Sequence, residues 1–150
     1  MSYKCYAVVR MAKARPFSFR PSASLDARLN SLAARTGLTK TAILESLADE
    51  SERVRRYPGI AFHGPDLRRR AWLLGTSLDV WEVVRALRDF GEDDQRMASE
   101  TDVPLRQIQL ARAYYQEFTD EIDGELALAE RSLDQLAREY PFIPQRTVEV

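Results

Sequence analysis

Two kinds of side chain alternate in the stretch PFSFRPS at residues 16–22, and they could do different chemistry. Ser18 and Arg20 alternate with two phenylalanines, a pattern typical of a short, half-buried strand. No neighbouring stretch looks like its partner, so a second copy of the chain is the simplest way to complete its hydrogen bonds. Two such segments paired antiparallel would turn the phenylalanines inward and the serine and arginine outward. A two-stranded ribbon with that open face fits the major groove of DNA.

Two helices are expected after this strand. Ser22 or Ser24 can cap the first helix, and the left-handed conformation open to Gly37 can end it. Thr39 can cap the second helix, which should run to about Arg56, where the sequence Tyr-Pro-Gly stops it.

The stretch FSFRPSASLDARLNSLAARTGLTKTAILESL resembles the ribbon-helix-helix repressors of the Arc, MetJ and CopG type. In that family an arginine ends the strand, a leucine follows five residues later, and an A-x-x-x-G-x-[ST] stretch joins the helices. The matching residues here are Arg20, Leu25, and Ala33 through Gly37 to Thr39. The family's commonest residues after the arginine are Leu-Pro, whereas this chain has Pro-Ser.

The resemblance implies a homodimer, or a higher oligomer, that binds double-stranded operator DNA. Ser18 and Arg20 would contact base edges, the start of the second helix would hold a phosphate, and the arm before the strand would attract DNA non-specifically. The residues expected at this interface are Lys13, Arg15, Ser18, Arg20, Thr39, Lys40 and Thr41. The alternative is an ordinary solvated strand face followed by threonines that merely cap a helix.

Charge is distributed unevenly along the chain. Residues 1–70 hold 14 Lys/Arg and 6 Asp/Glu, whereas residues 71–150 hold 8 and 17, although the net charge is only −1. A basic front half suits a polyanion such as nucleic acid, and an acidic rear half suits solvent or a basic protein.

The rear half predicts a winged helix-turn-helix-like unit. The stretch IAFHGPDLRRRAWLLG reads as a hairpin, and the pattern then predicts a helix from Ser77 or Asp79, a short acidic helix, and a helix beginning near Pro104. This order resembles a bacterial family with a G-T-R-[IV]-x-V stretch before a helix-turn-helix, matched here by GTSLDVWEVV from Gly75, with Ser77 in place of the arginine. That resemblance implies an antitoxin of the VapB type, encoded beside a PIN-like ribonuclease toxin.

The last of these helices could read DNA through its polar side chains. They are Arg106, Gln107, Gln109 and Arg112. Acidic residues crowd the same unit and would repel phosphates, so we favour a packing or dimerisation role for it.

A helix with a heptad seam is expected from Ile122 to Tyr140, followed by the tail YPFIPQRTVEV. In an antitoxin this tail would bind the toxin, and the expected contact residues are Tyr140, Phe142, Ile143 and Arg146. The alternative is that the tail folds against its own subunit.

No metal cluster is expected, since the chain has one cysteine, Cys5, and one histidine, His63. No catalytic constellation is expected, because His63 has no recognisable nucleophile arranged with it. No phosphate-binding glycine loop or other cofactor motif is expected, because the six glycines are scattered. We expect His63 to be a loop residue. No apolar run could span a membrane, and the start does not look like a secretory signal, which favours the cytoplasm.

Together these patterns predict a mainly α fold: a ribbon-helix-helix unit, then a winged helix-turn-helix-like domain, then a C-terminal helix. The expected division is 1–14 for an N-terminal arm, 15–57, 58–120, and 121–150. The predicted function is that of an antitoxin in a type II toxin-antitoxin system, and not that of an enzyme. The alternatives are a stand-alone ribbon-helix-helix regulator with an oligomerisation domain, and a structural interaction protein that binds no nucleic acid.

Overall fold

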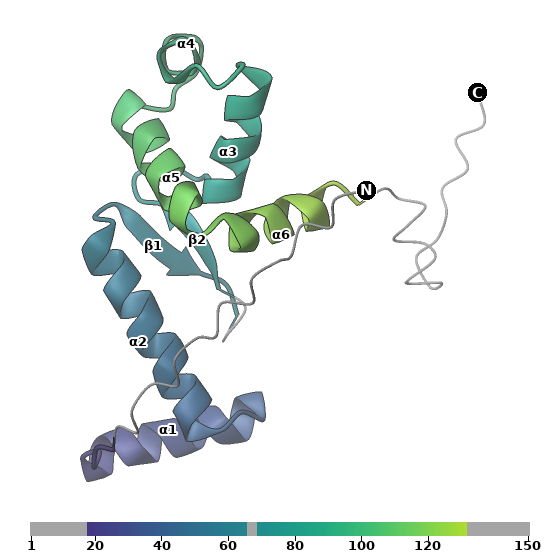
Figure 1. Cartoon of the computed structure of the whole chain (residues 1–150). Helices are drawn as coiled ribbons and strands as arrows, with labels where there is room; N and C mark the ends of the chain where they lie inside the picture. Colours follow the sequence, from purple (N-terminus) through teal and green to yellow (C-terminus); the bar gives the residue numbers. More distant parts are fainter. Residues whose placement is uncertain (1–17, 66–68, 132–150) are drawn as a thin grey trace, which may run out of the picture.

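The computed structural model describes residues 18–65 and 69–131. These residues form six α-helices and one two-stranded antiparallel sheet, which confirms a mainly helical fold. In Figure 1 the helices α1 (Ala23–Thr36) and α2 (Lys40–Arg56) form one end of the molecule, and the hairpin with the later helices forms the other.

The first two helices are α1 (Ala23–Thr36) and α2 (Lys40–Arg56). Their ends are set by the predicted caps. The hydroxyl of Ser22 accepts the N–H of Leu25 in the first turn of α1, and Gly37 ends the helix with φ 73°, in the left-handed region. The hydroxyl of Thr39 caps α2 in the same way.

Ahead of α1, residues 18–20 have no regular secondary structure in the single chain, and Phe19 is 51% exposed. Phe17 lies outside the described residues. The expected strand would form by pairing with a second chain, and the ribbon therefore stays a prediction.

The hairpin consists of β1 (Ile60–His63) and β2 (Arg70–Leu73), paired antiparallel with Ile60 opposite Leu73. Gly59 joins α2 to β1 at φ 113°, a backbone conformation that strains other residues, and a Cβ there would come within 2.8 Å of Cδ2 of Leu110, so this position favours glycine. His63 is the last residue of β1, and the prediction that it lies in a loop was wrong.

Three helices follow the hairpin in the predicted order: α3 (Val80–Asp89), α4 (Asp94–Glu100) and α5 (Leu105–Glu117). Asp79 is the N-cap of α3. In α5, Tyr114 is fully buried and its ring packs against Tyr57, just after α2. Tyr115 is partly buried against the core.

The last helix, α6 (Thr119–Ala129), buries Ile122 and Leu126 as the seam predicted. It ends at Ala129, so the prediction of one helix through to Tyr140 was wrong. The seam residues beyond residue 131 lie outside the described part.

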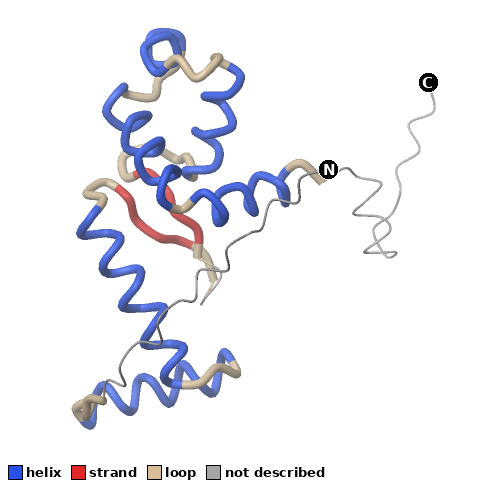
Figure 2. Tube along the Cα trace, viewed as in Figure 1, coloured by secondary structure: helices blue, strands red, loops and turns tan. Residues whose placement is uncertain are grey.

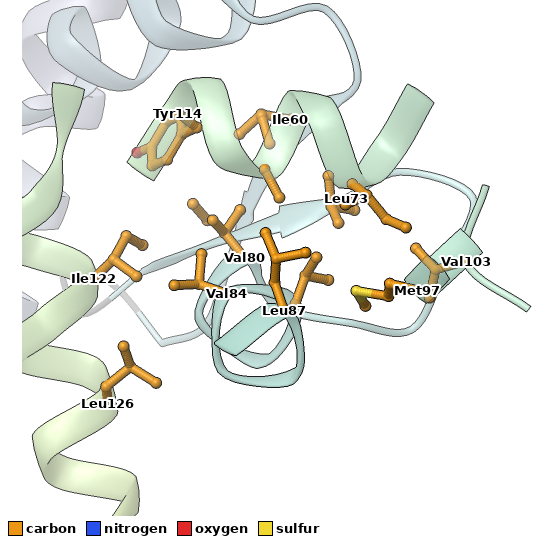
Figure 3. Close-up of a cluster of buried hydrophobic side chains, with 14 residues drawn as sticks. Ile60, Leu73, Val80, Val84, Leu87, Met97, Val103, Tyr114, Ile122 and Leu126 are labelled. Carbon is orange, nitrogen blue, oxygen red and sulfur yellow. The ribbon is translucent and has the colours of Figure 1, made fainter. Parts of the chain in front are cut away.

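The hydrophobic core lies in the rear unit, between the hairpin and α3 to α6 (Figure 3). Its labelled members come from every one of these elements. The α1–α2 pair lies apart from this cluster (Figure 2), and its fully buried side chains are Leu29 and Ile43. The two ends of the molecule therefore differ sharply in how much core they contain.

Within residues 18–65 and 69–131, every helix is too short or too polar to cross a bilayer.

Candidate nucleic-acid interface

The predicted DNA-contact residues that the structure describes fall into two groups on either side of α1. Ser18 and Arg20 are exposed just before α1, and Thr39, Lys40 and Thr41 lie at the α1–α2 turn. A helix of 14 residues is roughly 21 Å long, so one chain does not bring the two groups together. Lys13 and Arg15 lie outside the described residues, as do Tyr140, Phe142, Ile143 and Arg146.

The start of α2 has the properties of an anion site. The first turn contains no acidic residue, and the backbone N–H groups of Lys40 and Thr41 have no hydrogen-bond partner among the described residues. The Thr39 hydroxyl accepts the N–H of Ala42 at 3.2 Å. Free N–H groups at a helix start attract a phosphate.

Lys40 is already engaged in the free chain. Its Nζ lies 2.7 Å from Oδ1 of Asp26 on α1, and this hydrogen bond lowers the pKa of Asp26. Both side chains are more than 40% exposed, so the pair can share its lysine with an incoming phosphate.

The surface around these groups is basic. Residues 18–44 contain four Lys/Arg and one Asp/Glu. Arg20 and Arg28 are both exposed. This half of the α1–α2 unit therefore carries a net positive charge, which favours a polyanion.

The rear helix α5 is less available for DNA. Nε2 of Gln107 donates a hydrogen bond to the backbone oxygen of Leu74 at 2.7 Å, and Arg112 bonds Asp94 at 2.6 Å. Of the four polar side chains predicted on this helix, Arg106 and Gln109 are left exposed. The predicted acidic neighbours thus neutralise one of the two arginines directly.

A joint between the two units was not anticipated from the sequence. Arg53 on α2 lies 2.6 Å from Glu121 and 2.9 Å from the hydroxyl of Tyr114, and its guanidinium stacks 4.0 Å from the Phe118 ring. Burial alone would lower the pKa of Arg53, but the bonds to Glu121 and Tyr114 raise it. The partners are more than 60 residues away in sequence, so no local pattern could reveal them.

Aromatic packing extends the joint. Tyr57, just after α2, meets the Tyr114 ring edge-on at 5.3 Å and donates a hydrogen bond to Glu117. Arg56 forms an ion pair with the same Glu117 at 2.6 Å. These contacts fix the end of α2 against the junction of α5 and α6.

A second unanticipated cluster surrounds Asp79, which is 6% exposed. Its carboxylate bonds His63, and it accepts a hydrogen bond from the indole N–H of Trp81 at 3.1 Å. Arg70 approaches it at 3.2 Å. The cluster joins the hairpin to the start of α3 and leaves the histidine engaged with a carboxylate.

The charged groups of this cluster affect the pKa of Glu125 in α6. Burial raises its pKa to about 7, with further contributions from Glu121 and Asp79, whereas Arg70 and His63 oppose the rise. Its buried Oε2 has no hydrogen-bond partner among the described residues. The chain therefore holds a carboxyl group that titrates near neutral pH.

These groups do not form a metal site. Among the described residues, no three His, Cys, Asp or Glu side chains gather in a way that could bind an ion.

No family model matches the chain, and no curated protein or solved structure matches it either.

Proposed function

We propose that the protein is an antitoxin that binds operator DNA as a dimer through its N-terminal unit, with a ribbon-helix-helix arrangement. The observation that carries the proposal is the incomplete core of the α1–α2 pair. Leu29 and Ile43 are its fully buried side chains, while Leu38, Leu47 and Val54 are at least 40% exposed. Two helices with so little burial gain little free energy alone, so a second copy is the natural source of the rest.

The dimer would present one two-stranded ribbon, with polar side chains from both copies, to one DNA site. Strands from the two copies would pair, with Ser18 and Arg20 facing base edges. The free N–H groups at the start of each α2 would hold a backbone phosphate, with Thr41 and Lys40 beside them. The net positive charge of residues 18–44 supports this assignment.

The winged helix-turn-helix-like rear unit serves a different purpose in this proposal. Arg112 and Gln107 are held by contacts within the unit, which supports a packing role for α5 over a DNA-reading role. The joint around Arg53 holds this unit at a fixed place relative to α2. A rear unit held in this way is suited to carry the segment that binds the toxin.

DNA binding is tested with double-stranded DNA from upstream of the chain's own coding region. The intact protein should bind it with an affinity that falls steeply as salt rises. Arg20→Ala should weaken specific binding about fivefold or more, since one bidentate arginine contact to guanine contributes about 1–3 kcal/mol. Arg106→Ala is the matched control, because this exposed arginine lies on α5. If Arg106→Ala abolished binding and Arg20→Ala did not, α5 would be the reading element.

The antitoxin role is tested at the neighbouring reading frame. It should encode a PIN-like ribonuclease whose RNA cleavage is suppressed when this chain is added. A neighbouring gene of another kind, with DNA binding intact, would favour a stand-alone regulator. Absence of any salt-sensitive DNA binding would favour a structural interaction protein.

A further inference from the structure

Glu125 lies at the edge of the face that α6 packs against the rear core. Its neighbours on that face are Ile122 and Leu126, which are both buried and point toward α3 (Figure 3). The Oε2 atom of Glu125 is itself buried and has no hydrogen-bond partner among the described residues. A neutral carboxyl group tolerates such a place far better than a carboxylate does, because burying an unpaired charge is costly.

The hairpin brings two basic side chains toward Glu125, and both are already bonded to another carboxylate. Arg70 of β2 lies 3.2 Å from Asp79, and His63 of β1 bonds the same group. Asp79, at the start of α3, is 6% exposed and itself repels a negative charge on Glu125. The attraction from the hairpin is therefore offset by the carboxylate that holds it.

Glu121 adds a second negative charge one turn earlier on α6, on the same side of the helix. Its carboxylate pairs with Arg53 of α2 at 2.6 Å and accepts a hydrogen bond from the hydroxyl of Tyr114 in α5 at 3.1 Å. The positive charge that α2 brings to this region is thus bonded to Glu121.

The basic residue of α3 that pairs with α6 is Arg88, which lies 2.9 Å from Asp123. Asp123 and Glu125 are two residues apart, so they point to nearly opposite sides of the helix. On its own side, an ionised Glu125 meets Asp79 and Glu121, together with basic groups that these two carboxylates already hold. Ionisation therefore adds a buried negative charge that the surrounding groups do not balance.

We propose that Glu125 is a pH-dependent switch for the packing of α6: the protonated carboxyl lets the helix stay against α3 and α5, and the ionised carboxylate favours a state in which α6 has moved out toward water. The proton passes from the carboxyl group to a base in the solvent as pH rises. Because Glu121 is on the same helix, the movement also separates Arg53 from its partner, so the switch acts on the joint between the front and rear units. The inference goes beyond the proposed function and does not depend on it.

The direction of the effect follows from the proton balance. Burial raises the pKa of Glu125 from 4.5 to about 7 while α6 is packed, whereas a hydrated carboxyl group in the open state returns to the ordinary value. This group therefore favours packing fully below pH 4.5, and its contribution is lost as pH rises through 7. Between pH 6 and pH 8 the equilibrium constant for opening of α6 should rise about tenfold.

Amide hydrogen exchange of the intact chain at pH 6 and pH 8 tests the switch, after correction for the pH dependence of exchange in an unstructured peptide. In the natural chain, protection of α6 should fall about tenfold between the two values. Glu125→Gln cannot ionise and should give the same protection of α6 at both. Protection that stays constant in the natural chain, or that falls equally in both chains, would overturn the proposal.

Glu130→Gln is the matched control, because it removes an exposed carboxyl group at the end of the same helix. This variant should keep the pH dependence of the natural chain, and its loss would contradict the assignment to Glu125. A carbon-13 NMR titration of the Glu125 carboxyl in the natural chain needs no substitution. Its midpoint should lie near 7, and a midpoint near 4.5 would also overturn the switch. Neither readout involves operator DNA, so a negative result leaves the proposed function standing.

Discussion

The front and rear of this molecule bury their apolar side chains to different extents within one chain. The rear unit closes a core within one chain: the hairpin, α3, α5 and α6 all contribute fully buried side chains. The α1–α2 pair has two fully buried side chains and leaves apolar residues such as Leu47 and Val54 exposed. A complete core needs no partner, whereas an incomplete one identifies the surface where a partner belongs.

The largest expected effect separates these two modes of stability. Ile122→Ala should lower the free energy of unfolding by about 3 kcal/mol, because it opens a cavity in a core formed within one chain. Chemical denaturation should give the same loss at every protein concentration. Leu29→Ala should instead weaken dimerisation, so that its effect on stability grows on dilution. If the loss of stability depended on protein concentration in the same way for both variants, the contrast between the rear core and the front pair would be contradicted.

The joint between front and rear comes next. Arg53→Ala removes the partner of Glu121 and of the Tyr114 hydroxyl, and it uncovers the Phe118 ring. We expect a loss of about 2 kcal/mol, less than for a fully buried ion pair because Glu121 is 34% exposed. Thermal unfolding should also broaden or split into two transitions as the units uncouple. A single transition of unchanged midpoint would show that the joint does not couple them.

Glu125 gives the rear unit a dependence of stability on pH near neutrality. Its pKa is raised from 4.5 to about 7 in the folded chain, so between these values the unfolded chain releases a proton that the folded chain retains. Folding is therefore favoured below pH 4.5 by this group, and the contribution is lost as pH rises through 7. Glu125→Gln should raise the melting temperature by a few degrees at pH 8 relative to the natural chain, and by less at pH 5. An equal shift at both values would contradict the assignment.

The smallest effect concerns the surface of α5. Arg112→Ala breaks the pair with Asp94, and because Arg112 is 30% exposed we expect a loss of less than about 1 kcal/mol. Operator affinity, measured by fluorescence anisotropy, should stay within about threefold of that of the natural chain. A tenfold loss would make α5 a DNA-reading helix.

Local signals in the sequence were sufficient for most element boundaries. Ser22, Gly37 and Thr39 define helix ends through bonds to residues a few positions away, and such bonds leave a readable pattern. The mainly helical class and the hairpin followed from periodicity in the same way.

The contacts that the sequence did not predict join residues that lie far apart in the chain. His63 bonds Asp79, and Arg53 bonds Glu121, across the packed fold. Their partners are fixed by how the elements pack, so sequence spacing could not reveal them. Glu125 has a raised pKa for the same reason, because burial and neighbouring charges arise only after folding.

The central claim is that the α1–α2 pair is completed by a second copy. Hydrogen exchange of the intact chain, measured over a hundredfold range of protein concentration, tests this most directly. The account predicts that amide protection in α1 and α2 rises with concentration, while protection in α3 and α5 stays constant. Equal and constant protection in all four helices, in a chain that stays monomeric, would contradict it.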